Sequence, residues 1–168
     1  MEITSHTNPN SASDLLRADH RKIETHLDRM IRGLKNLTAD QVGCIQQAFV
    51  AIQQLSTLHF EQEERVFYPE IRPKIPDMLA KMDREHEDVR ETERCLAELL
   101  ASMPPIPVQR DMDELHRLGI EFHDAVQVHI VDEEEELLKT ADRLLSAADQ
   151  QRLAGLMSQL AVEMNGRG

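Results

Sequence analysis

Aromatic residues are scarce in this chain of 168 residues, which has no Trp, one Tyr and four Phe. Proteins that bind single-stranded nucleic acid usually stack the bases on aromatic side chains, and few are available here. Positive charge is scarce too, because 19 Lys and Arg face 31 Asp and Glu, which gives a net charge of −12. Repulsion between like charges therefore disfavours binding to nucleic acid or to an anionic membrane surface.

Long apolar runs and cysteine motifs are also missing. No stretch approaches the roughly 18 apolar residues that span a bilayer. The first residues, MEITSHTNPN, lack the basic and apolar regions of a signal peptide. Cys44 and Cys95 are far apart and form neither a CxxC motif nor a disulfide framework. We expect a soluble cytoplasmic protein with two reduced cysteines.

Gly and Pro interrupt the chain at only a few places, and the segments between them are rich in good helix formers. This pattern predicts an all-α protein. Thr38–Gln41 and Ser146–Asp149 have the spacing of capping boxes, and the prolines of 69–76 and 104–107 mark breaks. The sequence predicts helices at about 13–36, 38–68, 77–102, 109 to the early 140s, and 146–165.

Short connections force neighbouring helices to run in opposite directions. We therefore predict an up-down-up-down antiparallel four-helix bundle with a short extra C-terminal helix. Residues 1–12 are expected to form a flexible tail, 13–145 the bundle, and 146–168 the C-terminal helix and tail.

Each of the four long helices carries one histidine on its apolar face: His20, His59, His86 and His129. In an antiparallel pair, two residues lie at the same height when their midpoint in sequence falls at the turn. The midpoints of consecutive pairs are 39.5, 72.5 and 107.5, and all three fall on the predicted breaks. The four imidazoles are therefore expected in one layer of the core.

Two carboxylates are expected in the same layer. Glu63 and Glu133 each follow a histidine by four residues, in HFEQE and HIVDE, and so lie on the same helix face as that histidine. Buried imidazoles and carboxylates without partners are costly, and a metal removes the cost by taking their lone pairs. Two carboxylates suit divalent or oxidised iron, and two ions bridged by the carboxylates. A polar layer held only by hydrogen bonds is the alternative.

These pieces resemble the haemerythrin-like, HHE cation-binding family. The matching stretches, within about residues 13–140, are Asp19-His20, His59 to Glu64 with Phe67-Tyr68-Pro69, Glu85-His86-Glu87, and His129 to Glu134. The resemblance implies a non-haem di-iron site with two ions per chain, oxo- or hydroxo-bridged. It implies that the terminal ligands are His20, His59, His86 and His129, and that the bridges are Glu63 and Glu133. Ferritin-like di-iron proteins instead use ExxH, and no Glu stands three residues before a His here.

One position departs from the family. Oxygen-carrying haemerythrins have HxxxH on the third helix, but the residue four after His86 is Arg90, which has no lone pair to offer. Glu24 and Tyr68 are candidates for the missing ligand. Glu24 lies at a similar depth to Arg90, so we expect the two to meet and one iron to stay open to exogenous ligands. An Arg90→His change would then add a ligand. His6, His26, His116 and His123 are expected at the surface or its boundary.

Three functions remain open at this stage. The first is a module that binds or senses dioxygen, peroxide or nitric oxide at an open iron position. The second is a di-iron enzyme for peroxide decomposition or for nitric-oxide-linked iron–sulfur repair. The third is a metal-free helical interaction domain, which corresponds to the hydrogen-bonded layer.

Overall fold

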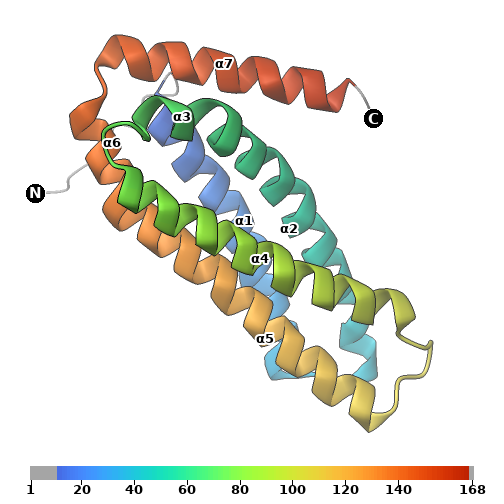
Figure 1. Ribbon diagram of the computed structural model, residues 1–168. Helices are drawn as coiled ribbons and strands as arrows, with labels where there is room; N and C mark the ends of the chain where they lie inside the picture. The colour runs from blue at the N-terminus through green and yellow to red at the C-terminus, as the bar shows by residue number, and fades with distance from the viewer. Residues whose placement is uncertain (1–10, 167–168) are drawn as a thin grey trace, which may run out of the picture.

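Four long helices lie alongside one another in the computed structural model, which describes residues 11–166 (Figure 1). These residues form helices and turns with no strand, so the all-α prediction is confirmed. Helix α1 packs mainly on α2 and also on α5, and α4 packs on α5. The long helices are α1 (Ala12–Lys35), α2 (Val42–Gln62), α4 (Pro76–Ser102) and α5 (Gln109–Asp132).

Helices α2 and α5 each continue beyond their last residue through a π-helical turn. Turn η2 (Glu63–Phe67) leads into α3 (Tyr68–Ile71), and η3 (Glu133–Leu138) leads into α6 (Lys139–Leu144). The predicted helix end at residue 68 is therefore wrong by three residues. Pro69 lies at the start of α3, where its missing N–H is tolerated, and the wider π turn before it spares a clash with the preceding turn.

The two predicted capping boxes differ in outcome. Thr38 makes no side-chain cap; its backbone carbonyl accepts the N–H of Gln41 at 2.9 Å, which closes a short 3-10 turn, η1 (Ala39–Gln41). Ser146 behaves as predicted at the start of α7 (Ala147–Asn165). Its Oγ accepts the Asp149 N–H at 3.1 Å, and Asp149 Oδ2 accepts the Ser146 N–H at 3.3 Å.

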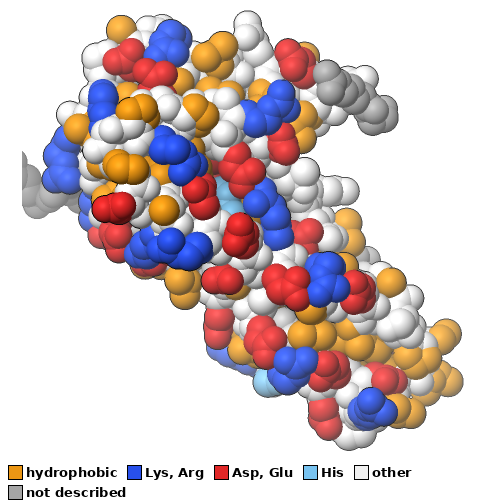
Figure 2. Space-filling model, in the orientation of Figure 1, with side chains coloured by type: hydrophobic (Ala, Val, Ile, Leu, Met, Phe, Trp, Pro, Cys, Tyr) orange, Lys and Arg blue, Asp and Glu red, His pale blue; other side chains and the backbone are white. Residues whose placement is uncertain are grey.

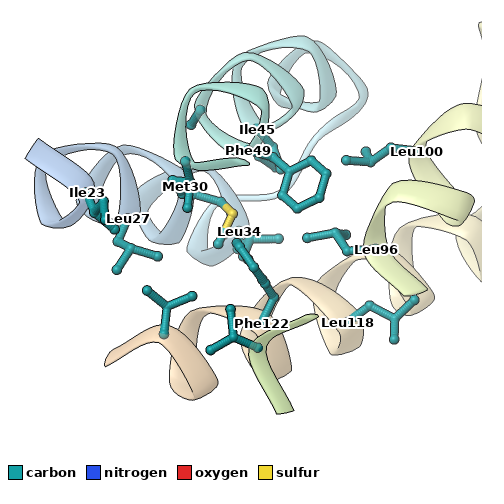
Figure 3. Packing of buried hydrophobic residues seen from close by; sticks show 14 of the residues in the cluster. Ile23, Leu27, Met30, Leu34, Ile45, Phe49, Leu96, Leu100, Leu118 and Phe122 are labelled. Carbon is teal, nitrogen blue, oxygen red and sulfur yellow. The ribbon is translucent and has the colours of Figure 1, made fainter. Parts of the chain in front are cut away.

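The apolar core is divided into two clusters by a buried polar layer. The larger cluster fills the half of the bundle that holds the 36–41 and 103–108 connections, and Phe49 meets Phe122 there edge-on with ring centroids 5.2 Å apart (Figure 3). The smaller cluster, on the other side of the polar layer, includes Leu16, Phe67, Tyr68 and Leu79.

Helix α7 covers the end of the smaller cluster (Figure 1). Leu153, Ala154 and Met157 are buried in that cluster. Two polar contacts fix α7 in place: Gln62 Nε2 donates to the Met157 carbonyl at 2.9 Å, and Gln150 Nε2 donates to Ser13 Oγ at 2.9 Å. The C-terminal helix therefore completes the core next to the polar layer.

Two further sequence expectations concern the surface and the thiols. Within residues 11–166, no helix is both long enough and apolar enough to cross a membrane. Cys44 is exposed, Cys95 is partly buried, and both are free thiols, as predicted. The predicted N-terminal tail falls almost wholly outside the described residues.

Candidate metal centre

The polar layer brings together all six side chains that the sequence singled out. We define the first donor group as His20, His59, Glu63 and Glu133. Each residue offers one nitrogen or oxygen atom, and these atoms lie within 4.8 Å of one another. The second donor group meets the same limit and contains Glu63, His86 and His129. All six residues are at most 1% exposed. The midpoint argument therefore placed the four imidazoles at the correct height.

Glu63 belongs to both groups and faces each with a different oxygen. Its Oε1 lies 3.0 Å from His59 Nε2, and its Oε2 lies 3.1 Å from His86 Nε2. Glu133 Oε2 lies 3.0 Å from His20 Nε2 and 3.8 Å from His129 Nε2. Glu63 thus spans the two groups, whereas Glu133 belongs to the first and approaches the second with the same oxygen.

The layer has acceptor atoms that no well-aligned hydrogen bond reaches. Both oxygens of Glu63 and Oε2 of Glu133 are fully buried and lack such a partner within the described part of the chain. A buried carboxylate oxygen in this state is costly, and a bound cation would remove the cost. Imidazole nitrogens and carboxylate oxygens are a donor set that iron accepts. The residues present therefore fit a metal centre.

In the metal-free protein, protons take the place of the cation. Burial alone would lower the pKa of His20, but contacts with Glu133 and Glu134 outweigh it and raise the pKa to about 10. The pKa of His86 is raised to about 9 in the same way, by Glu63 and Glu64 against the effect of burial. Burial would raise the pKa of Glu63, yet the charges of His59 and His86 hold it well below its usual range.

Behind each imidazole stands a second carboxylate, on the side away from the donor groups. Nδ1 of His86 lies 2.6 Å from Glu64 Oε1, and Nδ1 of His20 lies 2.8 Å from Glu134 Oε1. The corresponding distances are 3.2 Å for His129 and Glu85, and 4.0 Å for His59 and Asp19. At His20, His86 and His129 the carboxylate is within hydrogen-bond distance and fixes the ring with Nε2 pointing inward, whereas His59 Nδ1 has no hydrogen-bond partner among the described residues. We call Asp19, Glu64, Glu85 and Glu134 the outer carboxylates.

Sequence reasoning did not assign these four carboxylates to individual imidazoles. A signal was present, because each is adjacent in sequence to a donor residue: Asp19 to His20, Glu64 to Glu63, Glu85 to His86, and Glu134 to Glu133. All four nevertheless face an imidazole on another helix, which adjacency in sequence alone does not reveal.

The comparison with known families agrees with this geometry. Residues 11–141 match the model of the hemerythrin HHE cation-binding domain. The chain belongs to this family. No curated protein and no solved structure matches it significantly.

Arg90 is the position at which this haemerythrin domain departs from the oxygen carriers, and its predicted contact with Glu24 is wrong. Glu24 pairs with Arg21 at 3.2 Å, whereas Arg90 Nη2 donates to Glu64 Oε1 at 2.6 Å. The Arg90 side chain is 48% exposed, and its guanidinium packs 5.3 Å over the ring of Phe60. The prediction used only the height of Glu24 and Arg90 along the bundle. Height does not determine the direction in which each side chain points around its helix.

Phe60 lies against both Arg90 and His86. Its ring stacks on His86, with centroids 3.9 Å apart, and occupies the side of His86 from which Arg90 approaches. The Phe60 ring therefore contacts both His86 and the Arg90 guanidinium.

Tyr68 is the candidate for the missing ligand that does reach the layer. Its hydroxyl donates to Glu133 Oε1 at 3.2 Å and lies 3.3 Å from His86 Nε2. The side chain is fully buried, and burial together with Glu133 raises the pKa of the phenol well above its usual value. In the metal-free protein Tyr68 is therefore a hydrogen-bond donor to the layer.

The remaining histidines lie away from this layer. His116 is exposed, and His26 and His123 are partly buried, as the sequence predicted. His123 Nδ1 lies 2.9 Å from Asp124. His6 falls outside the described residues.

Proposed function

We propose that this haemerythrin domain binds two iron ions in the buried layer. His20 and His59 would hold one ion, His86 and His129 would hold the other, and Glu63 and Glu133 would bridge them. The observation that carries the proposal is the position of Glu63, whose two oxygens face the two donor groups separately. The proposal takes α1, α2, α4 and α5 as an up-down-up-down four-helix bundle, which is the arrangement that brings one histidine from each helix to one height.

The second donor group has fewer members than the first, and we propose Tyr68 as its additional donor. The phenol oxygen is 3.3 Å from His86 Nε2 and so lies among the donor atoms of that group. Arg90 offers no lone pair at the position where oxygen carriers have a histidine. A phenolate oxygen is a hard ligand, which suits oxidised iron.

Iron in this layer would bind a small ligand such as dioxygen, peroxide or nitric oxide. The chain's own residues would shield that ligand from bulk water, because Phe60 and Tyr68 both stack on His86 and are buried. The partner we propose is therefore a small diatomic molecule or peroxide, and neither nucleic acid nor a membrane.

Anaerobic loading with ferrous iron tests this proposal. We expect about two irons per chain by elemental analysis, because two carboxylates bridge the donor groups. We also expect changes in the optical spectrum when the loaded protein meets dioxygen, peroxide or nitric oxide. The surface variant His123→Ala should behave like the parent, whereas His59→Ala should lose iron.

The same experiment separates a binding module from an enzyme. A spectrum that changes once and then persists indicates binding, and continuous consumption of peroxide indicates peroxide decomposition. Two bound irons with an unchanged spectrum for all three ligands would contradict the small-ligand part of the proposal. Absence of bound iron would contradict the metal part and favour a hydrogen-bonded layer.

A further inference from the structure

Two of the outer carboxylates are themselves held by arginine. Arg90 Nη2 donates to Glu64 Oε1 at 2.6 Å, and the same oxygen lies 2.6 Å from His86 Nδ1. On the other side of the layer, Arg21 Nη2 pairs closely with Glu134 Oε1, which lies 2.8 Å from His20 Nδ1. Each chain of contacts runs from the surface through a carboxylate to a buried imidazole.

Both arginines are surface residues. Their side chains are 48% exposed at Arg90 and 58% exposed at Arg21. Figure 2 shows basic and acidic side chains side by side across the middle of the bundle, where such pairs lie. By ordinary criteria these are solvent-exposed ion pairs, which contribute little to folding.

The other two outer carboxylates are held more loosely. Lys22 Nζ lies 2.7 Å from Asp19 Oδ1, but Asp19 Oδ2 stands 4.0 Å from His59 Nδ1. Lys81 Nζ is 3.9 Å from Glu85 and much closer to Asp132, at 2.8 Å. Close contact from cation to carboxylate to imidazole is thus confined, among the four histidines of the layer, to His20 and His86.

His20 belongs to the first donor group, and His86 belongs to the second. We propose that Arg21 and Arg90 are positioning residues, one for each metal position, and that each sets the affinity of its own position by holding the carboxylate that orients the imidazole. This inference rests on the proposed function, because it assumes that the two groups bind metal.

The physical reason lies in the freedom of the two carboxylates. Glu64 is 34% exposed and Glu134 is 23% exposed, so without a cation each can turn toward water. The arginine holds the carboxylate against Nδ1 through a charge-assisted hydrogen bond, and the carboxylate in turn keeps Nε2 directed at the metal position. Removal of the arginine should therefore weaken metal binding.

Charge repulsion alone predicts the opposite change in metal affinity. An arginine repels a bound cation, so its removal should on charge alone strengthen metal binding slightly. Arg94 provides the matched control, because it lies on α4 one turn beyond Arg90, is exposed, and pairs only with Glu91 and Glu98 among acidic residues, away from the layer. Arg94→Gln changes the charge by the same amount and leaves every outer carboxylate in place.

The test measures the two iron affinities of Arg21→Gln, Arg90→Gln and Arg94→Gln by anaerobic equilibrium dialysis of ferrous iron against a competing chelator. We expect Arg21→Gln and Arg90→Gln each to weaken one of the two iron affinities by about tenfold, since outer partners of metal ligands are worth roughly 10–100-fold. The double variant should weaken both. Arg94→Gln should match the parent or bind slightly more tightly, and the metal-free melting temperature should be unchanged in all variants.

Arg90→Lys adds a second check, because it keeps the charge and shortens the reach to Glu64. Partial recovery of affinity is expected. If the parent binds two irons and the Arg21→Gln and Arg90→Gln variants match Arg94→Gln, this inference is wrong while the proposed function stands. If the parent binds no iron, both are wrong.

Discussion

Glu63 is the residue on which the two-metal interpretation depends most directly. It lies in both donor groups, and a glutamine in its place would present one oxygen and one NH₂ group, which cannot ligate a metal. We expect Glu63→Gln to lower bound iron from about two per chain to one or none. Elemental analysis of the loaded variant measures this. Glu61→Gln, in an exposed pair with Arg65 on the same helix, is the control and should keep both irons.

Tyr68 can be followed without interference, because it is the only Tyr in the chain and there is no Trp. If its oxygen binds oxidised iron, the ferric protein should show a phenolate-to-iron absorption band in the visible region. Tyr68→Phe should abolish this band and keep the helical circular dichroism of the parent. A visible band that is unchanged in Tyr68→Phe cannot come from a phenolate and would remove Tyr68 from the ligand set.

At the residue scale, the sequence predicted the six inner donors but not the residues that hold them. Spacing and midpoints fix the height of a side chain in a bundle, and height was sufficient for His20, His59, His86 and His129. Height does not fix the direction around the helix axis. The Arg90–Glu24 contact was predicted wrongly for this reason. Arg90 instead donates to Glu64, which lies in η2.

At the scale of the helices, the two halves of the layer share one sequence pattern. An acidic residue and a histidine adjoin on the first helix of each half, at 19–20 and 85–86, and HxxxEE follows on the second helix, at 59–64 and 129–134. Glu63 begins the π-helical turn η2, and Glu133 begins η3. Such turns shift the residues after them around the helix axis and are common at functional sites. A prediction based on the α-helical period of 3.6 residues cannot detect these π-helical turns.

The start of α7 offers a test of how much this helix stabilises the fold. Ser146 accepts the N–H of Asp149 at 3.1 Å, and α7 covers the apolar cluster beside the polar layer. Ser146→Ala should lower the free energy of unfolding by about 1 kcal/mol, the usual cost of losing an N-cap. Chemical denaturation of the metal-free protein measures it. Ser158→Ala, in the middle of α7, should leave the free energy of unfolding nearly unchanged, because Ser158 bonds only to the carbonyl of Ala154 in its own helix.

For the whole molecule, the order of helices was predictable because Pro and capping signals mark the breaks, but the division of the core was not. The polar layer lies between two apolar clusters, and α7 closes the smaller one. Metal that binds only the folded chain should therefore raise the melting temperature, and a chelator should lower it. Identical melting curves with and without iron would contradict a metal centre at this place in the core.

The pH dependence of the metal-free protein and that of iron binding should run in opposite directions. The pKa values of His20 and His86 are raised to about 10 and about 9 in the folded state, from about 6.5 when unfolded. Their contribution to stability is complete below pH ~6.5 and is lost as the pH rises through the folded values. The free energy of unfolding of the metal-free protein should therefore fall between pH 6.5 and pH 9.

Iron must displace these protons, so its affinity should rise across the same pH range and binding should release protons into a weakly buffered solution. The iron-loaded protein should accordingly lose less stability with pH than the metal-free form. Denaturation at pH 6.5 and pH 9, with and without iron, measures both trends, and His116→Ala controls for an exposed histidine. A metal-free stability that is flat or increasing over this range would mean that His20 and His86 are not protonated in the folded chain, and that the buried layer balances its carboxylates in another way.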